Sequence, residues 1–105
     1  MVYHIVLFKL KEDIPPTVLD DMMMQTRTQL LKIPEVLSLK CGKHIDPASE
    51  WHFFLAIDFD SMEKLAVYRV HPVHIKYVEN VIKPLTLDHK IVDFEMEPHK
   101  NVKYS

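Results

Sequence analysis

The sequence predicts an α+β fold, in which helices cover a four-stranded antiparallel sheet and the elements follow the order β-α-β-β-α-β. Four segments rich in β-branched and aromatic residues alternate along the chain with segments of helical spacing. A length of 105 residues with 48% hydrophobic residues suffices for one core but not for two domains. We therefore expect a single domain over residues 1–97, followed by a polar tail at 98–105.

The first strand is expected at residues 2–10, VYHIVLFKL. Its even-numbered and odd-numbered side chains point to opposite faces, and both faces are largely apolar, so both must be covered. A helix is expected over residues 13–33, because Pro15 and Pro16 suit a first turn and apolar side chains then recur at helical spacing. Pro34 ends this helix.

Three further strands are expected at residues 35–45, 51–59 and 87–96, where apolar and aromatic residues alternate with polar ones. A polar turn, DPASE, separates the first two of them. Together with the helical segments, they complete the order that the ferredoxin-like fold adopts.

The second helical segment lies between the last two strands. Asp60 with Glu63 three residues later resembles a capping box and predicts a helix through about Val70. A further helical piece is expected from Pro72 to about Lys83.

One face of the predicted sheet has no helix to cover it. In the ferredoxin-like fold both helices lie on the same face, yet the strands at 2–10 and 51–59 are apolar on both sides. An exposed apolar face of this kind indicates an interface, and a second copy related by two-fold symmetry is the simplest cover. The sequence thus predicts a homodimer formed through the sheet faces, a dimeric α+β barrel.

Composition excludes several classes of function. A net charge of −2 with no basic stripe argues against nucleic-acid binding, and no apolar run is long enough to span a membrane, so a cytoplasmic location is expected. Gly42 is the only glycine, which excludes phosphate-binding and dinucleotide-binding loops. Cys41 is the only cysteine and is expected to be an inert, half-buried thiol. Chemistry therefore has to come from histidine, tyrosine and carboxylate side chains without a cofactor.

The segment LAVYRVHPVHIKYV, residues 65–78, concentrates such side chains around a proline. Pro72 should break the helix, because it lacks an N–H group and pushes His71 out of the α region. His74 then lies in the first turn of a new helix, where the helix dipole disfavours the imidazolium form. A neutral histidine is a competent general base, and Tyr68 could donate a hydrogen bond to an oxyanion.

His4 is the polar exception on an apolar face of the first strand. It is either a core histidine with a structural partner or a functional group, and the sequence leaves both readings open. A metal site formed by His4, His71 and His74 has suitable ligand types, but the proline break argues against it, and no metal is expected. His71 is expected to be a structural pre-proline residue; it is also a candidate for contact with substrate. His44, His52, His89 and His99 show no pattern.

Several segments together resemble the stress-responsive α/β-barrel (Dabb) family. They are HIVLFKLK near the start, IPEVLSLKCGK, FDSMEKLAVYRVHPVHIKYV and the late IVDFE, and they span nearly the whole chain. The resemblance implies a ferredoxin-like chain that dimerises through its sheet. The Tyr-x-x-His-Pro-x-His pattern recurs across the family, including members that are not known to be cyclases, so it predicts the fold more strongly than an activity.

One branch of the family contains polyketide cyclases of the olivetolic acid cyclase type. Resemblance to that branch implies cofactor-free acid–base chemistry on a carbonyl compound, with His4, Tyr68 and His74 as catalytic residues and Asp93, which matches that enzyme's late-strand aspartate, as a substrate-binding residue. By the same analogy an apolar substrate pocket would be lined by Phe8, Met22, Met23, Leu55 and Ile57. That enzyme places an aromatic pair on the first helix where this chain has Met23 and Thr26, so the same substrate is not expected.

Three hypotheses for the function remain open. The first is a small-molecule pocket that carries out cyclase- or isomerase-like proton transfer on an apolar carbonyl ligand. The second is a non-catalytic, stress-associated dimer or oligomer in which the same residues form a buried polar network. The third is a monooxygenase that handles haem or a quinone, since such chemistry also occurs on dimeric α+β barrels.

Overall fold

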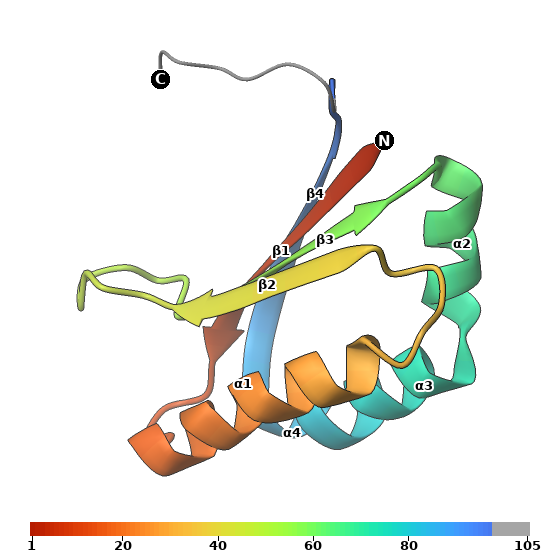
Figure 1. Ribbon diagram of the computed structural model, residues 1–105. Coiled ribbons are helices and arrows are strands. Elements are labelled where there is room, and N and C mark those ends of the chain that lie inside the picture. Colours follow the sequence, from red (N-terminus) through yellow and green to blue (C-terminus); the bar gives the residue numbers. More distant parts are fainter. Residues whose placement is uncertain (98–105) are drawn as a thin grey trace.

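The computed structural model describes residues 1–97, so the tail expected at 98–105, with His99, lies outside the described residues. Figure 1 shows a sheet with helices on one side, and the ferredoxin-like α+β fold expected from the sequence is confirmed. The elements are β1 (Val2–Leu10), α1 (Pro16–Leu30), β2 (Ser38–Lys43), β3 (Phe53–Phe59), α2 (Met62–Val70), α3 (Pro72–Tyr77), the π-helix η1 (Val78–Ile82), α4 (Lys83–Leu85) and β4 (Thr86–Glu95).

The four strands lie in the order β2-β3-β1-β4, and each pairs antiparallel with its neighbours. β1 is therefore central, and its register fixes which side chains share a face. His4 stands opposite Ile57 on one side and opposite Asp93 on the other. This pairing brings the first and last strands of the chain together at the histidine that the sequence singles out.

The first helix is shorter than residues 13–33. Asp13 has a φ of 61°, in the left-handed region, and Pro15 is extended with a ψ of 152°, so the regular helix begins only at Pro16. The chain leaves it after Leu30. The helical spacing that predicts this helix also predicts a buried stripe, and Met22, Thr26 and Leu30 are fully buried, whereas Val18 is half-buried and Ile33 lies beyond the end of the helix.

The second helix has a different cap from the one expected. Ser61, not Asp60, is the N-cap residue, and its hydroxyl accepts a hydrogen bond of 3.3 Å from the backbone N–H of Lys64. A serine cap satisfies a free N–H group as well as aspartate does, so the helix forms as expected with its start moved by one residue.

The break at Pro72 is confirmed. His71 is extended, with φ −64° and ψ 134°, and its Nδ1 accepts a hydrogen bond of 3.1 Å from the backbone N–H of Val73. After the break the sequence predicts one regular helix to about Lys83. The structure instead inserts η1 between α3 and α4, and such π-helical turns are frequent at functional sites.

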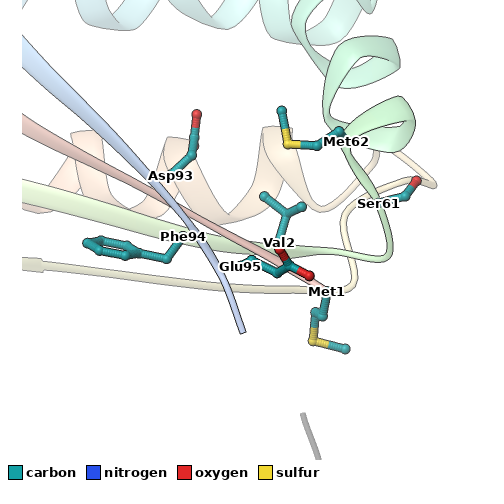
Figure 2. A pocket seen from close by; sticks show the side chains of 7 residues that line it. All are labelled: Met1, Val2, Ser61, Met62, Asp93, Phe94 and Glu95. Carbon is teal, nitrogen blue, oxygen red and sulfur yellow. The ribbon is translucent and has the colours of Figure 1, made fainter. Parts of the chain in front are cut away.

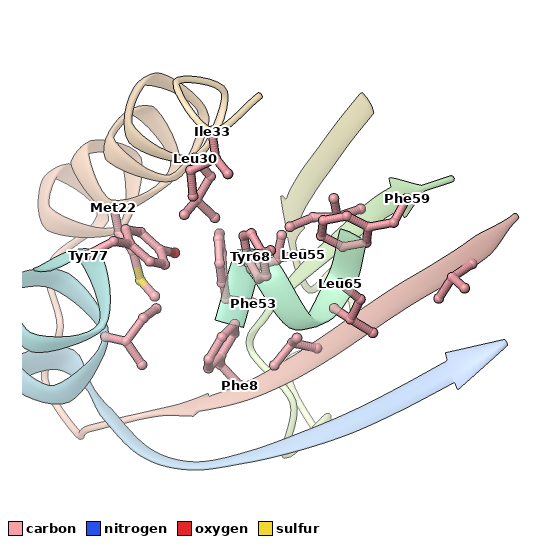
Figure 3. Packing of buried hydrophobic residues seen from close by; sticks show 14 of the residues in the cluster. Phe8, Met22, Leu30, Ile33, Phe53, Leu55, Phe59, Leu65, Tyr68 and Tyr77 are labelled. Atoms are coloured by element: carbon pink, nitrogen blue, oxygen red, sulfur yellow. The ribbon is translucent and has the colours of Figure 1, made fainter. Parts of the chain in front are cut away.

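The core lies between the helices and the sheet. Its side chains come from β1, β3, α1 and α2, with Ile33 from the loop after α1 and Tyr77 and Ile82 from the segment after Pro72. Figure 3 shows these side chains converging. β1 alternates strictly between buried and half-buried residues, with the buried ones facing the helices. β4 is largely exposed even on this face, because it is an edge strand and the helices pack over the other three strands.

The opposite face of the sheet carries apolar side chains that no helix covers. Phe54 and Phe94 are 37% and 53% exposed on it, and Ile5 and Leu7 lie half-buried between them. The single glycine leaves room for the Phe54 ring on this face, since a Cβ atom on Gly42 would lie 2.8 Å from that ring. None of the helices within residues 1–97 is both long and apolar enough to cross a membrane.

Candidate functional site

A cavity of about 240 Å³ lies between the sheet and the helical segment after Pro72. Its walls are mostly apolar, and its polar side chains come from β1, β4, α2 and α3. The lining residues are His4, Val6, Phe8, Leu55, Tyr68, Arg69, His74, Tyr77, Val78, Ile82, His89 and Ile91.

His4 is held by a carboxylate. Only 4% of His4 is exposed, and its Nδ1 lies 2.5 Å from Oδ1 of Asp93 on the neighbouring strand. The other oxygen, Oδ2, accepts a hydrogen bond of 3.3 Å from Nη2 of Arg69 on α2. Because a carboxylate accepts, the His4 Nδ1–H donates, which leaves Nε2 as the unprotonated nitrogen of the neutral ring.

His74 is oriented in the same way by the backbone. Its Nδ1–H donates to the carbonyl oxygen of Arg69 at 3.0 Å, so Nε2 is again the nitrogen that can accept a proton. Burial lowers the pKa of His74 below its usual value, and this effect exceeds that of the Arg69 carbonyl, which raises it. The sequence attributes a neutral His74 to the helix dipole; desolvation is the main cause in the structure.

Tyr68 lies between the two histidines. Its ring centroid is 4.4 Å from that of His74 and 6.1 Å from that of His4. Burial raises the pKa of Tyr68 well above its usual range, with a smaller contribution from Tyr77, so the phenol keeps its proton at neutral pH. It can therefore act as a hydrogen-bond donor.

Three polar atoms of this cluster are without a partner in the part of the chain that the structure describes. Within residues 1–97, no hydrogen bond is made by Nε2 of His4, by Nε2 of His74 or by the Tyr68 hydroxyl. These three atoms are accessible to solvent. The one side-chain polar atom within residues 1–97 that is both fully buried and without a partner is a different atom, Oδ1 of Asp58. One end of an apolar cavity thus presents three free hydrogen-bonding groups.

The structure brings together only some of the residues that the sequence proposes. Phe8 and Leu55 line the cavity with His4, Tyr68 and His74. The other apolar candidates lie elsewhere. Met22 and Ile57 are fully buried in the core. Met23 is half-buried on α1, and its backbone oxygen lies beside the Cys41 thiol.

His71 is also absent from the cavity lining. Its Nδ1 is engaged by the Val73 N–H as the cap of α3, which agrees with a structural role for a residue before proline. No cluster of three or more histidine, cysteine, aspartate or glutamate side chains among residues 1–97 is arranged to hold a metal ion. Burial raises the pKa of the Cys41 thiol, which makes it less reactive.

Asp93 stands behind His4 rather than in the cavity wall. Figure 2 shows it in a second, open cavity of about 310 Å³ near the start of β1, with Val2 and Met62 close by. Its side chain is 27% exposed there. Asp93 therefore orients His4 from outside the first cavity and has contact with solvent.

Three polar lining residues were not predicted from the sequence, namely Arg69, Tyr77 and His89. Strand alternation could have found His89, because residues 89, 91 and 93 share one face of β4, and Asp93 was already a candidate. Arg69 and Tyr77 flank the proline break, and the sequence contains no signal that distinguishes them from other helical residues.

Known proteins share both the sequence pattern and the architecture. Residues 2–96 match the family model described as Stress responsive A/B Barrel Domain, or Dabb. A stress-response A/B barrel domain-containing protein of Arabidopsis thaliana is 30% identical over 96 residues, which cover 90% of this chain and 36% of that protein. The chain thus spans about a third of the length of this curated relative.

Solved structures show the same fold. A dimeric ferredoxin-like protein of unknown function from Bacteroides fragilis superposes with a TM-score of 0.78 at 26% identity, covering 90% of this chain and 95% of that one. A hydroxynitrile lyase from Passiflora edulis has a TM-score of 0.79 at 15% identity, with coverages of 95% and 96%, and shares the fold. Since the family model spans nearly all of the described residues, the chain belongs to the stress-responsive A/B barrel (Dabb) family.

Proposed function

We propose that the protein binds a small carbonyl compound in the cavity next to His4, Tyr68 and His74 and moves a proton at the carbon beside the carbonyl. The observation that carries this proposal is a set of three polar atoms, at one end of an otherwise apolar cavity, that have no hydrogen-bond partner among residues 1–97. Polar groups in such a setting usually serve a ligand, because leaving them without a partner costs free energy.

The geometry suggests a role for each group. Nε2 of His74 accepts the proton from the α-carbon, and the electron pair of the broken C–H bond moves to the carbonyl oxygen as an enolate. The Tyr68 hydroxyl donates a hydrogen bond to that oxygen. His4, oriented by Asp93, supplies a second nitrogen that can donate or accept a proton. Return of a proton from His74 to the same carbon exchanges the α-hydrogen, and its delivery to the oxygen gives the enol, an isomer of the ketone.

The size of the cavity restricts the ligand. Ligand pockets usually hold about 300–1,000 Å³, whereas this cavity holds about 240 Å³. A compound with one ring or a short chain fits these limits better than a long polyketide. The hydroxynitrile lyase from Passiflora edulis shares the fold, so the fold itself is compatible with lyase chemistry.

Dimerisation through the open face of the sheet is part of the proposal. The exposed Phe54 and Phe94 make this face apolar, and the dimeric state of the protein from Bacteroides fragilis supports an assembly of two chains. A mass in solution of two chains is the expected result.

Proton exchange tests the proposed chemistry. Acetophenone, a small ketone with α-protons, is incubated with the protein in deuterated buffer, and loss of its methyl signal is followed by NMR. We expect His74→Ala to slow the protein-dependent exchange by about 10²- to 10⁴-fold, because it removes the general base. His44→Ala is the matched control, since His44 lies in an exposed loop with its Nδ1–H donated to the carbonyl of Asp46.

A second function is favoured by one observation. The contacts of Asp93 with His4 and Arg69 join β1, β4 and α2, as a structural polar network would. A non-catalytic stress-associated protein of this kind would show no exchange above buffer, and His74→Ala would lower only its melting temperature. That outcome would replace the catalytic proposal.

A further inference from the structure

The cavity has a second polar position, on the edge strand. On the face of the sheet that lines it, β1 and β4 pair His4 with Asp93, then Val6 with Ile91, then Phe8 with His89. His89 therefore lies four residues along β4 from Asp93, the residue that is paired with His4. At the usual rise of a strand, that separation is about 13 Å.

The ring nitrogens of His89 are available to a ligand at this position. Its side chain is exposed and lines the cavity, with its ring centroid 6.4 Å from that of Phe8. Its backbone N–H bonds to Asp88, but neither ring nitrogen has a hydrogen-bond partner in the part of the chain that the structure describes. A neutral imidazole offers one donor and one acceptor, which suits a hydroxyl group.

The stretch between the two polar positions is apolar. Val6 is buried, and Ile91, although 48% exposed, contributes to the same wall. Most of β4 is exposed to solvent, and His89 belongs to this exposed part of the cavity wall. A ligand with its carbonyl group at the buried end would extend past Val6 and Ile91 toward His89.

We infer that His89 is a specificity-determining residue that selects small ketones carrying a hydroxyl group at the end remote from the carbonyl. This inference rests on the proposed function, because it places the carbonyl beside Tyr68 and His74. A ligand held at both polar positions needs its two oxygen atoms at opposite ends of an apolar body. A para-hydroxylated aryl methyl ketone has this arrangement.

Two probes that differ only in the remote hydroxyl test the inference. Acetophenone and 4′-hydroxyacetophenone are titrated into the protein, and dissociation constants are obtained from NMR shifts. We expect the hydroxylated ketone to bind about three- to tenfold more tightly, the gain of one neutral hydrogen bond. His89→Leu should abolish this preference, and His89→Gln, which retains a donor and an acceptor, should keep part of it. Lys90→Ala is the control, since Lys90 is the next residue on β4 but points to the other face.

The outcomes separate this inference from the proposed function. Exchange of acetophenone α-protons without any preference for the hydroxylated probe would overturn the role of His89 and leave the chemistry standing. A preference lost in His89→Leu without any exchange would keep the role of His89 and remove the chemistry. A preference that persists in His89→Leu, or binding of neither probe, would overturn the inference.

Discussion

Tyr68 and Tyr77 line the same cavity and are buried almost equally, at 2% and 3% exposure, yet their hydroxyl groups are in different situations. The Tyr77 hydroxyl lies 2.7 Å from Oγ1 of Thr26 on α1. The Tyr68 hydroxyl has no partner among residues 1–97, although burial raises the pKa of both phenols. Two tyrosines that are equally buried thus differ in whether their hydroxyl groups are hydrogen-bonded within residues 1–97.

The direction of the Tyr77 hydrogen bond can be assigned. Thr26 donates its hydroxyl proton to the backbone carbonyl of Met22 at 2.7 Å, so its oxygen accepts from Tyr77. Tyr77 therefore ties the segment after Pro72 to α1. The Tyr68 hydroxyl makes no comparable hydrogen bond within residues 1–97, which is the pattern expected of a group that binds a ligand.

Removing each hydroxyl in turn should have the largest effect on activity. Tyr68→Phe is expected to lower ketone α-proton exchange by about 10²-fold or more, because one donor to the enolate oxygen is lost. Tyr77→Phe should leave exchange within a few-fold of the wild type. The measurement is the exchange assay with acetophenone; equal losses in the two variants would show that the tyrosines do not differ in function.

The two substitutions should affect stability in the opposite order, with the larger loss in Tyr77→Phe. Tyr77→Phe is expected to lower the free energy of unfolding by about 1 kcal/mol, the net value of one hydrogen bond, whereas Tyr68→Phe should change it little. Thr26→Val should cost more, about 1–3 kcal/mol, because it leaves the Tyr77 donor buried without a partner. Urea unfolding measures all three variants, and a Tyr68→Phe protein as destabilised as Tyr77→Phe would argue for a structural Tyr68 hydroxyl.

The smallest effect concerns pH. Burial first, and then the charges of His4, Arg69 and His71, lower the pKa of His74. Exchange needs the neutral base, so its rate should rise with pH, with a midpoint below the usual histidine pKa of about 6.5, and level off near neutrality. A midpoint at or above that value in the exchange assay would contradict a buried, neutral His74.

The same shift makes stability depend on pH. The unfolded chain binds a proton at His74 more readily than the folded chain, so stability should increase as pH rises from the folded pKa to the unfolded pKa of about 6.5. Below the folded pKa this contribution is lost. Replacing His74 by Gln should flatten the stability profile in that window, as urea unfolding at a series of pH values would show.

Local patterns were enough to predict the elements and their order. Alternation in VYHIVLFKL indicated β1 with its two faces, and Pro72 marked the break at which His71 becomes extended. Such features depend on neighbouring residues, so they can be inferred from sequence. The edges of elements were less accurate: the cap moved from Asp60 to Ser61, and no local signal announced the π-helical turn at η1.

The candidate site divides in the same way. His4, Tyr68 and His74 could be named from the sequence because their positions, one on an apolar strand and two beside a proline, are locally unusual. Resemblance to the Dabb family suggested Asp93, and the structure places it against His4. Met22 and Ile57 looked like pocket residues because they are apolar, yet they pack in the core, since hydrophobicity does not distinguish a cavity wall from a filled interior.

By itself, the sequence determined the ferredoxin-like order, the apolar second face of the sheet and the proline break, and it made His4, Tyr68 and His74 candidates, because each of these features is visible in spacing and side-chain type along the chain. Only the tertiary structure decided that the Tyr68 hydroxyl has no partner within residues 1–97 while Tyr77 is bound to Thr26, and that His89 shares a wall with His4. Those facts depend on strand register and on how α1 meets α3, which bring together residues distant in sequence.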